Sequence, residues 1–523
     1  MKQNKSKPIK TVALMMAATV IAKTLGLIRN MLLAPNYGIG TEANAFSAAA
    51  NIPLNFFDLL FSAAVLGSFI PVYNSFKAEE NSEADEFASV FYNVILFLTG
   101  LLALAGIIFA VPIINIMSPG LAADTKLLAA DLLRIMFPMI IFTGMAYTLV
   151  GILQSKGKYL VPAFISAVSN AGVIIYLLFF NRLFGDKSIY GLAAAYLASW
   201  LIQLITLLIP AAKSGFKYRF IINLKNKAFL RVVKMALPIM IGSWLAPVTL
   251  LSGLFFAPYA GNITVFDYSY NLYCMTAGIL TYSLCNYIFP LLSKLAASGG
   301  ADEFCDIVRK GLVSAFIIIV PFMFGVMILS GEGVAVLYMR REFNGEAAYL
   351  TANALSTMAA GMPAYALIEI CSRVFYSKNL YKIPMFSAVG GIAVNIISAL
   401  ILINIKISGV GAVGISAVTG QAAAAVILII FIYKKIKNII NKKIITDIVK
   451  IFISGITSFI VMLALYKCIG NRPYAAETSA VKNILTAIAV FSAGAAVYIA
   501  GLGIAKVSDF KIFNKFKRGG GNL

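Results

Sequence analysis

Long apolar stretches separated by short polar loops dominate the chain. About 14 of them are long enough to cross a membrane as helices, which needs roughly 20 residues each. The stretches are continuous rather than alternating, and this favours helices over a β-barrel. The pattern therefore predicts an all-α polytopic membrane protein with spans near 11–34, 43–74, 88–116, 127–153, 159–181, 190–212, 232–257, 265–292, 309–338, 348–375, 383–405, 411–433, 446–467 and 483–505.

Positive charge is distributed unevenly between alternate loops. If the N-terminus is cytoplasmic, 30 of the 43 Lys and Arg residues lie on the cytoplasmic side, nine lie on the other side and four lie inside spans. Cytoplasmic loops are normally the richer in these residues. We therefore predict an even number of spans and two cytoplasmic termini.

The two halves of the chain resemble each other. QSKGKYLVPAFISAVSNAGVII (154–175) aligns with YSKNLYKIPMFSAVGGIAVNII (376–397) at an offset of 222, with eight of 22 positions identical. Six spans plus six spans in the same orientation form a parallel repeat, which usually encloses a site near the membrane midplane. We predict an N-terminal lobe (1–212), a cytoplasmic linker (213–231), a C-terminal lobe (232–433), and two additional spans with a basic cytoplasmic tail (434–523).

Composition narrows the chemistry that the chain can perform. The net charge of +22 lies mostly in short loops between spans, which argues against nucleic acid as a partner. The absence of His excludes His-based metal sites and acid/base triads. The five Cys form no C-x-x-C pattern, and no phosphate-binding P-loop occurs. We expect no cofactor and no metal, and a carrier rather than an enzyme.

Two cations interrupt the first apolar stretch. In a helix that begins near Thr11, Lys23 lies ~18 Å and Arg29 ~27 Å deep in a ~30 Å hydrocarbon core. Each side chain either reaches the headgroups or faces a wet cavity that receives an anion. The depth of Lys23 favours the cavity, whereas both readings stay open for Arg29. Gly26 lies between them and permits bending or close packing.

Other polar residues inside spans have simpler explanations. Asp131/Arg134 and Glu369/Arg373 have the i, i+3 and i, i+4 spacings of ion pairs on one helix face. Asp58 has no such local partner, so Lys23 or Arg29 on the neighbouring helix is a candidate. The second and eighth spans carry asparagines that either bond neighbouring helices or line a polar cavity: Asn44, Asn55, Asn271 and Asn286.

Several segments resemble a known family. KTLGLIRNMLLAPNYGIGTEANAF (23–46) and NIPLNFFDLLFSAAVLGSFIPVY (51–73) resemble the opening of MurJ/MviN, the lipid II flippases of the MOP exporter superfamily. FPLLSK (289–294), LYMRREF (337–343) and FYSKNLYKIP (375–384) also resemble family segments. The resemblance implies two six-helix lobes around a cationic cavity, and alternating access that moves a lipid-linked peptidoglycan precursor outward.

The resemblance also implies which residues act. Arg29 keeps one of the family's first-span arginines that bind the diphosphate, and Lys23 replaces the other with a point charge. We predict six substrate-binding residues and three hinges. The substrate-binding residues are Lys23, Arg29, Asn44, Asn55, Asp58 and Asn271, and the hinges are Gly26, Pro35 and Pro258.

The chain departs from the family pattern in several places. Asn30 and Asn44 replace family acids, and Phe57 and Asn271 replace family arginines, so the cavity is less cationic. The sodium site of some members needs carboxylates in the seventh and eleventh spans. None occurs in residues 235–264 or 383–405, so we expect no sodium at that site.

The leading prediction is a monomeric lipid II flippase of the bacterial plasma membrane. Its expected partners are a lipid-linked diphosphate substrate, membrane lipids and cell-wall synthesis proteins. Two alternatives are other transporters: a flippase for another lipid-linked oligosaccharide or a sporulation-type exporter, and a cation-coupled drug antiporter that uses Asp58 or Glu369. A non-transporting scaffold is the third alternative.

Overall fold

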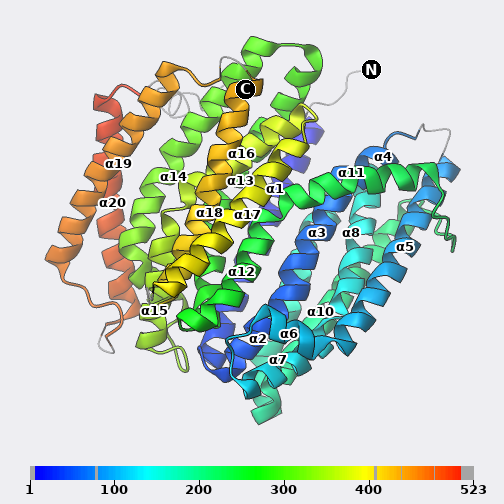
Figure 1. Ribbon diagram of the computed structural model, residues 1–523, viewed down its shortest axis with the longest axis horizontal. Helices are drawn as coiled ribbons and strands as arrows, with labels where there is room; N and C mark the ends of the chain where they lie inside the picture. Colours follow the sequence, from blue (N-terminus) through cyan, green and yellow to red (C-terminus); the bar gives the residue numbers. More distant parts are fainter. Residues whose placement is uncertain (1–5, 77–80, 406–408, 437–438, 476–477, 508–523) are drawn as a thin grey trace. The chain divides into compact units, whose positions relative to one another are not determined.

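The computed structural model describes residues 6–76, 81–405, 409–436, 439–475 and 478–507. Within these ranges the backbone forms helices joined by loops, with no β-strand (Figure 1). The predicted all-α class is therefore confirmed.

The chain divides into two compact units. Unit 1 comprises Met1–Pro258 together with Arg340–Glu342, and unit 2 comprises Tyr259–Met339 and Phe343–Leu523. The division falls near the end of the helix Leu245–Ala260, so most of that helix packs with unit 1. The lobes were predicted from the internal sequence repeat and not from packing. Their boundaries therefore stay a prediction.

Unit 1 contains most of the helices of the first half of the chain. Three π-helical turns interrupt them, η1 (Ile52–Phe57), η2 (Val65–Phe69) and η4 (Tyr176–Phe180), and η5 (Asn181–Lys187) is a 3₁₀ segment. The α-helices are α1 (Ser6–Tyr37), α2 (Thr41–Asn51), α3 (Asp58–Ala64), α4 (Ile70–Tyr73), α5 (Asn81–Ile108), α6 (Ala110–Met117), α7 (Ala123–Met136), α8 (Met139–Ser155), α9 (Leu160–Ile175), α10 (Ser188–Lys213), α11 (Lys227–Ser243) and α12 (Leu245–Ala260).

The helices of unit 1 pack in a chain of neighbours. α1 contacts α9, α9 contacts α10, α10 contacts α8, and α8 contacts α5. The α5 side of the core is aromatic: the Phe69 ring lies 5.2 Å from that of Phe87 and 4.8 Å from that of Phe91, between centroids. α11 lies crosswise to α3, α8 and α5 (Figure 1). It joins α12 through a 51° bend at Trp244.

Unit 2 packs around one long helix, α14 (Ala301–Tyr338). α14 contacts α13, α15, α16, α19 and α20, and α17 packs against α18. The remaining helices are α13 (Ile263–Ser298), α15 (Gly345–Ala359), α16 (Met362–Ser377), α17 (Lys382–Asn404), α18 (Val410–Lys435), α19 (Lys442–Ile469) and α20 (Ala480–Ile504).

Nine helices of the described chain are long and apolar enough to cross a membrane, or up to 12 if each of three bent pairs is one span. The predicted count of about 14 is not confirmed. Part of the difference between the two counts lies in one segment. The predicted spans 159–181 and 190–212 fall in a single helical stretch, Leu160–Lys213, which is counted once. That stretch has 54 residues, ~80 Å if it were straight. It turns back instead, because Gly185 breaks the helix with φ 49° and α9 packs against α10.

Apolar side chains cover the outside of several helices. On α5, Phe97, Leu101, Leu104 and Ile108 recur every three or four residues, and each is more than half exposed. α19 carries a similar exposed stripe, from Ile445 to Ile460. An exposed apolar face at helical spacing is favourable in hydrocarbon and costly in water. The chain is thus a multi-pass membrane protein.

Candidate substrate site

Arg29 of α1 is held by neutral groups. Its Nε and Nη2 donate to Asn30 Oδ1 at 3.2 and 3.0 Å, and its Nη1 donates to Asn170 Oδ1 at 3.1 Å. The guanidinium also lies 5.6 Å from the ring centroid of Tyr196. None of the ion pairs found in the described chain includes Arg29. The half-buried guanidinium is therefore fixed in position while its charge stays available.

Asn170 of α9 joins two helices around this cation. Its Nδ2 donates to the Ser166 carbonyl at 2.7 Å and to the Ala22 carbonyl of α1 at 3.4 Å. A Cβ added at Gly26 would lie 3.6 Å from Asn170 Nδ2, which is an ordinary contact. Gly26 therefore lies beside the amide that orients Arg29, inside an unbroken helix.

Lys23 is exposed on α1, six residues before Arg29. Its positive charge acts on the Asp58 carboxylate of α3. Asp58 also accepts a hydrogen bond from the Tyr147 hydroxyl of α8, at 3.0 Å to Oδ2. Lys23 and Arg29 were both candidate partners of Asp58. The structure shows an interaction with Lys23 and adds Tyr147.

The two asparagines predicted near the second span bond locally. Asn44 Nδ2 donates to the Ile39 carbonyl at 3.1 Å. Asn55 Nδ2 donates to Asn51 Oδ1 one helical turn earlier. Their substrate-binding role stays a prediction.

Unit 2 holds the remaining predicted residue, Asn271. This half-buried side chain donates from Nδ2 to the carbonyl of Asp267 at 2.9 Å and to its Oδ1 at 2.8 Å. Glu369 and Arg373 form an ion pair of 3.3 Å within unit 2.

The predicted ion pairs are confirmed in both units. In unit 1, Asp131 and Arg134 pair at 2.6 Å on an exposed face of α7. These pairs form as their sequence spacing predicts, because residues three or four apart lie on one helix face. The carboxylates of Asp131 and Glu369 are therefore both paired with an arginine.

The predicted hinges lie inside continuous helices. Pro35 is in the last turn of α1, where its carbonyl accepts the Glu342 amide at 3.3 Å, and Pro258 is in α12. The bend nearest to Pro258 occurs at Trp244, with Pro247 in the first turn after it. The hinge roles of Gly26, Pro35 and Pro258 stay a prediction.

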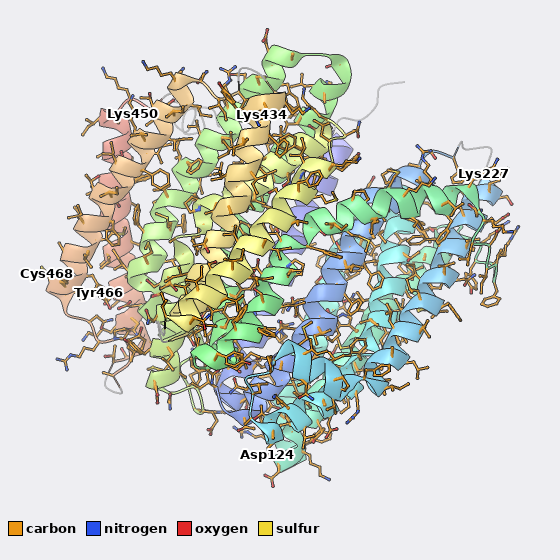
Figure 2. The ribbon with its side chains drawn as sticks, in the orientation of Figure 1. Asp124, Lys227, Lys434, Lys450, Tyr466 and Cys468 are labelled. Atoms are coloured by element: carbon orange, nitrogen blue, oxygen red, sulfur yellow. The ribbon has the colours of Figure 1, made fainter. Side chains whose placement is uncertain are left out.

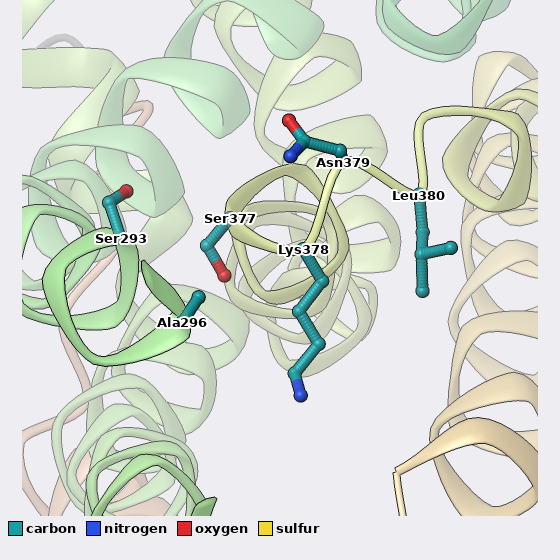
Figure 3. Close-up of a pocket in the computed structure, with 6 residues that line it drawn as sticks. All are labelled: Ser293, Ala296, Ser377, Lys378, Asn379 and Leu380. Carbon is teal, nitrogen blue, oxygen red and sulfur yellow. The ribbon is translucent and has the colours of Figure 1, made fainter. Parts of the chain in front are cut away.

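A pocket of about 470 Å³ opens on unit 2 (Figure 3). Ser293 and Ala296 of α13 face Ser377 of α16 and the turn that follows it, through Lys378 to Leu380. Lys378 Nζ lies 4.5 Å from the ring centroid of Phe304. None of the predicted substrate residues lines this pocket.

Three residues that the sequence pattern does not mark contact charged groups from other helices, and a fourth, Glu332, is itself a buried charged residue. Asn170, Tyr147 and Tyr196 reach the cations or Asp58 from other helices. Glu332 was a detectable signal, because it is a carboxylate inside the apolar span 309–338.

The fold is similar to those of two solved membrane proteins. A solved structure titled as the lipid II flippase MurJ in an inward closed conformation matches with TM-score 0.76 and 22% identity, covering 94% of this chain and 99% of that chain. An inward-facing multidrug resistance MATE family transporter of the MOP superfamily matches with TM-score 0.59 and 16% identity, covering 81% and 95%.

The sequence comparisons define the family. The model of the lipid II flippase MurJ family matches residues 33–484. The probable lipid II flippase MurJ of Bdellovibrio bacteriovorus is 28% identical, covering 80% of this chain and 82% of the relative. That of Buchnera aphidicola subsp. Acyrthosiphon pisum is also 28% identical, covering 73% and 75%. The chain belongs to the lipid II flippase MurJ family, as its sequence motifs predicted.

Proposed function

We propose that this chain moves lipid II from the cytoplasmic to the outer leaflet of the bacterial plasma membrane by alternating access. Membership of the MurJ family supports this function. The single structural observation that carries it is Arg29, a cation in α1, the first predicted span, whose bonded partners are neutral amides. Such a cation favours an anionic ligand, because a charge in a low-dielectric site is stabilised by an opposite charge.

The geometry of Arg29 suits a phosphate. A guanidinium has five N–H groups in a planar fork. Three hydrogen bonds to Asn30 and Asn170 orient the fork, and two N–H groups have no partner among the described residues. A phosphate oxygen would accept from them in a charge-assisted bond.

Lys23 supplies the second charge for a diphosphate. It is exposed, and its distance of six residues along α1 places it on a different side of the helix from Arg29. The two cations would flank the diphosphate rather than stack along it. Asn44, Asn55 and Asn271 would add neutral hydrogen bonds, and Asp58 would limit the net charge around Lys23.

The proposed orientation follows from the charge of the loops, and the proposed movement of the lobes follows from the internal repeat. Both termini are cytoplasmic, the predicted lobes rock about Gly26, Pro35 and Pro258, and the chain acts as a monomer beside cell-wall synthesis proteins. The substrate crosses without a change in its covalent bonds. No cofactor takes part in this scheme.

Rescue of a strain depleted of its own lipid II flippase tests the proposal. The wild-type chain and Arg134→Ala should rescue, because the Arg134 charge is already paired on an exposed face. Arg29→Ala should fail at equal membrane abundance. It should also bind lipid II about 10- to 100-fold more weakly, the loss expected for hydrogen bonds to a charged group.

Binding by the purified protein is the second measurement. Lipid II should bind more tightly than undecaprenyl phosphate, which lacks the second phosphate and the sugar headgroup. A chain that is abundant and inserted but neither rescues nor distinguishes the two lipids would refute lipid II as the substrate.

A further inference from the structure

Glu332 is a carboxylate buried inside unit 2, and it is not one of the predicted substrate residues. It lies near the end of α14 and has 0% exposure. Its Oε1 accepts a hydrogen bond from Asn471 Nδ2 at 3.0 Å. Its Oε2 is also buried and has no hydrogen-bond partner among the described residues. Half of the carboxylate is therefore unsatisfied in the structure.

The amide that reaches Glu332 is unsatisfied in the same way. Asn471 Nδ2 also donates to Asn483 Oδ1 at 2.8 Å, and Asn483 Nδ2 donates to the Pro473 carbonyl at 3.2 Å. These bonds use both N–H groups of the Asn471 amide and one of the two of Asn483. They leave buried Asn471 Oδ1 without a partner in the described chain. The cluster thus presents two orphaned oxygens, and both are acceptors.

Lys467, Arg472 and Lys482 are the cations nearest to the cluster in the sequence, and no ion pair found in the described residues joins one of them to Glu332. Tyr466 of α19 makes a side-chain hydrogen bond to the Glu332 carboxylate, and as a neutral hydroxyl it brings no positive charge. Tyr474, in the loop after α19, covers the cluster beside Gly331, where a Cβ would lie 2.8 Å from the Tyr474 hydroxyl. Burial and the Glu332 charge raise the pKa of Tyr474 to about 12, so this hydroxyl stays neutral.

An isolated carboxylate is costly in such a place. Removing it from water costs several kcal/mol unless a counter-charge or full hydrogen bonding replaces the lost hydration. The end of α19 adds to the negative potential, because Asn471 follows its C-terminal carbonyls at Ile469 and Gly470. Carboxylate, amide oxygen and helix C-terminus together favour a positive ligand.

We propose that Glu332 and Asn471 bind a small monovalent cation between α14 and the loop that joins α19 to α20. Glu332 Oε2 and Asn471 Oδ1 would be its ligands, and oxygen donors are those that hard cations prefer. One carboxylate and one amide carry a single negative charge, which suits an ion of charge +1 rather than a divalent ion. A search of the described residues finds no group of three His, Cys, Asp or Glu, so the site does not resemble a multi-carboxylate divalent site.

Thermal unfolding of the purified full-length protein tests the site independently of lipid II transport. Sodium chloride would replace N-methylglucamine chloride at constant ionic strength, with unfolding followed by circular dichroism. A ligand that binds the folded state raises Tm as its concentration rises. We expect sodium to raise Tm of the wild type by several degrees, with a plateau.

Glu332→Gln is the decisive variant. Its amide would donate to Asn471 Oδ1 and remove the buried charge, so the variant should fold and exceed the Tm of the wild type without sodium. Its Tm should not respond to sodium. Glu369→Gln is the matched control, because that carboxylate is paired with Arg373 and should leave the sodium response intact.

Two results would overturn the cation site. One is a sodium response that persists in Glu332→Gln. The other is a wild-type Tm that ignores sodium, lithium and potassium but rises on acidification, which would assign a proton to Glu332 instead. Equilibrium binding of radiolabelled sodium to both proteins provides the direct readout.

Discussion

At the scale of single residues, Asn30 shows how the charge of Arg29 is kept available for the anion that we propose. It stands where the family pattern has an acid, and its Oδ1 accepts two of the three hydrogen bonds that orient Arg29. A carboxylate in the same position would neutralise the guanidinium, whereas an amide only orients it. In the proposed site, the charge of Arg29 would partly make up for the positive charge lost where Phe57 and Asn271 stand in place of family arginines.

In the proposed site, Asp58 would compete with the substrate for Lys23. The carboxylate is held by Tyr147 and interacts with the Lys23 charge, so it lowers the positive potential that a phosphate would meet. Asp58→Asn should therefore lower the Kd for lipid II several-fold in a direct binding assay, because the opposing charge is removed. Asp131→Asn should leave the Kd unchanged, since Asp131 faces Arg134 on an exposed part of α7. Weaker binding by Asp58→Asn would show that Asp58 supports the site instead.

At the scale of elements, a polar stripe on α5 fixes the segment between α10 and α11. Asp85 accepts the Lys217 amide at 3.1 Å, and the Ser89 hydroxyl accepts the Arg219 amide at 3.1 Å. Asn93 donates to the carbonyls of Arg219 and Ile221 at 3.1 and 3.0 Å. Their spacing of four residues places all three on one helix face. The predicted linker is thus docked on unit 1 by hydrogen bonds to its backbone.

Removal of Asp85 should loosen this segment. Asp85 also pairs with Lys156 at 3.5 Å, so Asp85→Ala leaves a backbone amide and a cation without their partner. We expect a loss of about 2–3 kcal/mol in docking free energy and faster tryptic cleavage at Lys217 and Arg219. Asp85→Asn should be intermediate, because its amide oxygen still accepts the Lys217 amide.

Asp124→Ala is the control for that cleavage assay. Asp124 lies at the opposite end of unit 1 from Lys227 in Figure 2. Its removal should leave the linker as resistant as in the wild type. Equal cleavage of the Asp85 and Asp124 variants would mean that the stripe does not stabilise the segment.

At the scale of the whole molecule, the charged ends of the helices predict the orientation. In unit 2, Lys434 and Lys450 lie at one end and Cys468 lies at the other (Figure 2). Cytoplasmic ends are the richer in Lys and Arg. In a background without the five native Cys, single cysteines near Glu42 or Arg472 should react with an impermeant thiol reagent in intact cells.

A cysteine near Lys225 should react only after the cells are opened. This site lies in the basic segment that we place in the cytoplasm, so it provides the internal control for membrane integrity. Labelling of Lys225 but not of Glu42 or Arg472 in intact cells would reverse the orientation of the entire chain.

Several features could be predicted from the sequence because they depend on local spacing. The apolar stretches predicted helices, and the i, i+3 and i, i+4 pairs at Arg134 and Arg373 form as spaced. The cations of the first span and the family motifs predicted the MurJ family. The break predicted between 181 and 190 contains the turn at Gly185, whereas the count of about 14 spans is not confirmed by the nine to 12 found in the described residues.

Tertiary structure alone decided which distant groups meet the charges. Asn170 is 141 residues from Arg29, Tyr147 is 89 from Asp58, and Asn471 is 139 from Glu332. Each contact joins segments that are far apart in the chain, so it depends on which helices and loops pack together and with which faces. Helical periodicity fixes the neighbours on one helix but not those across an interface. The sequence by itself therefore determined the family, the membrane helices and the location of the first-span charges, whereas packing decided how those charges are held.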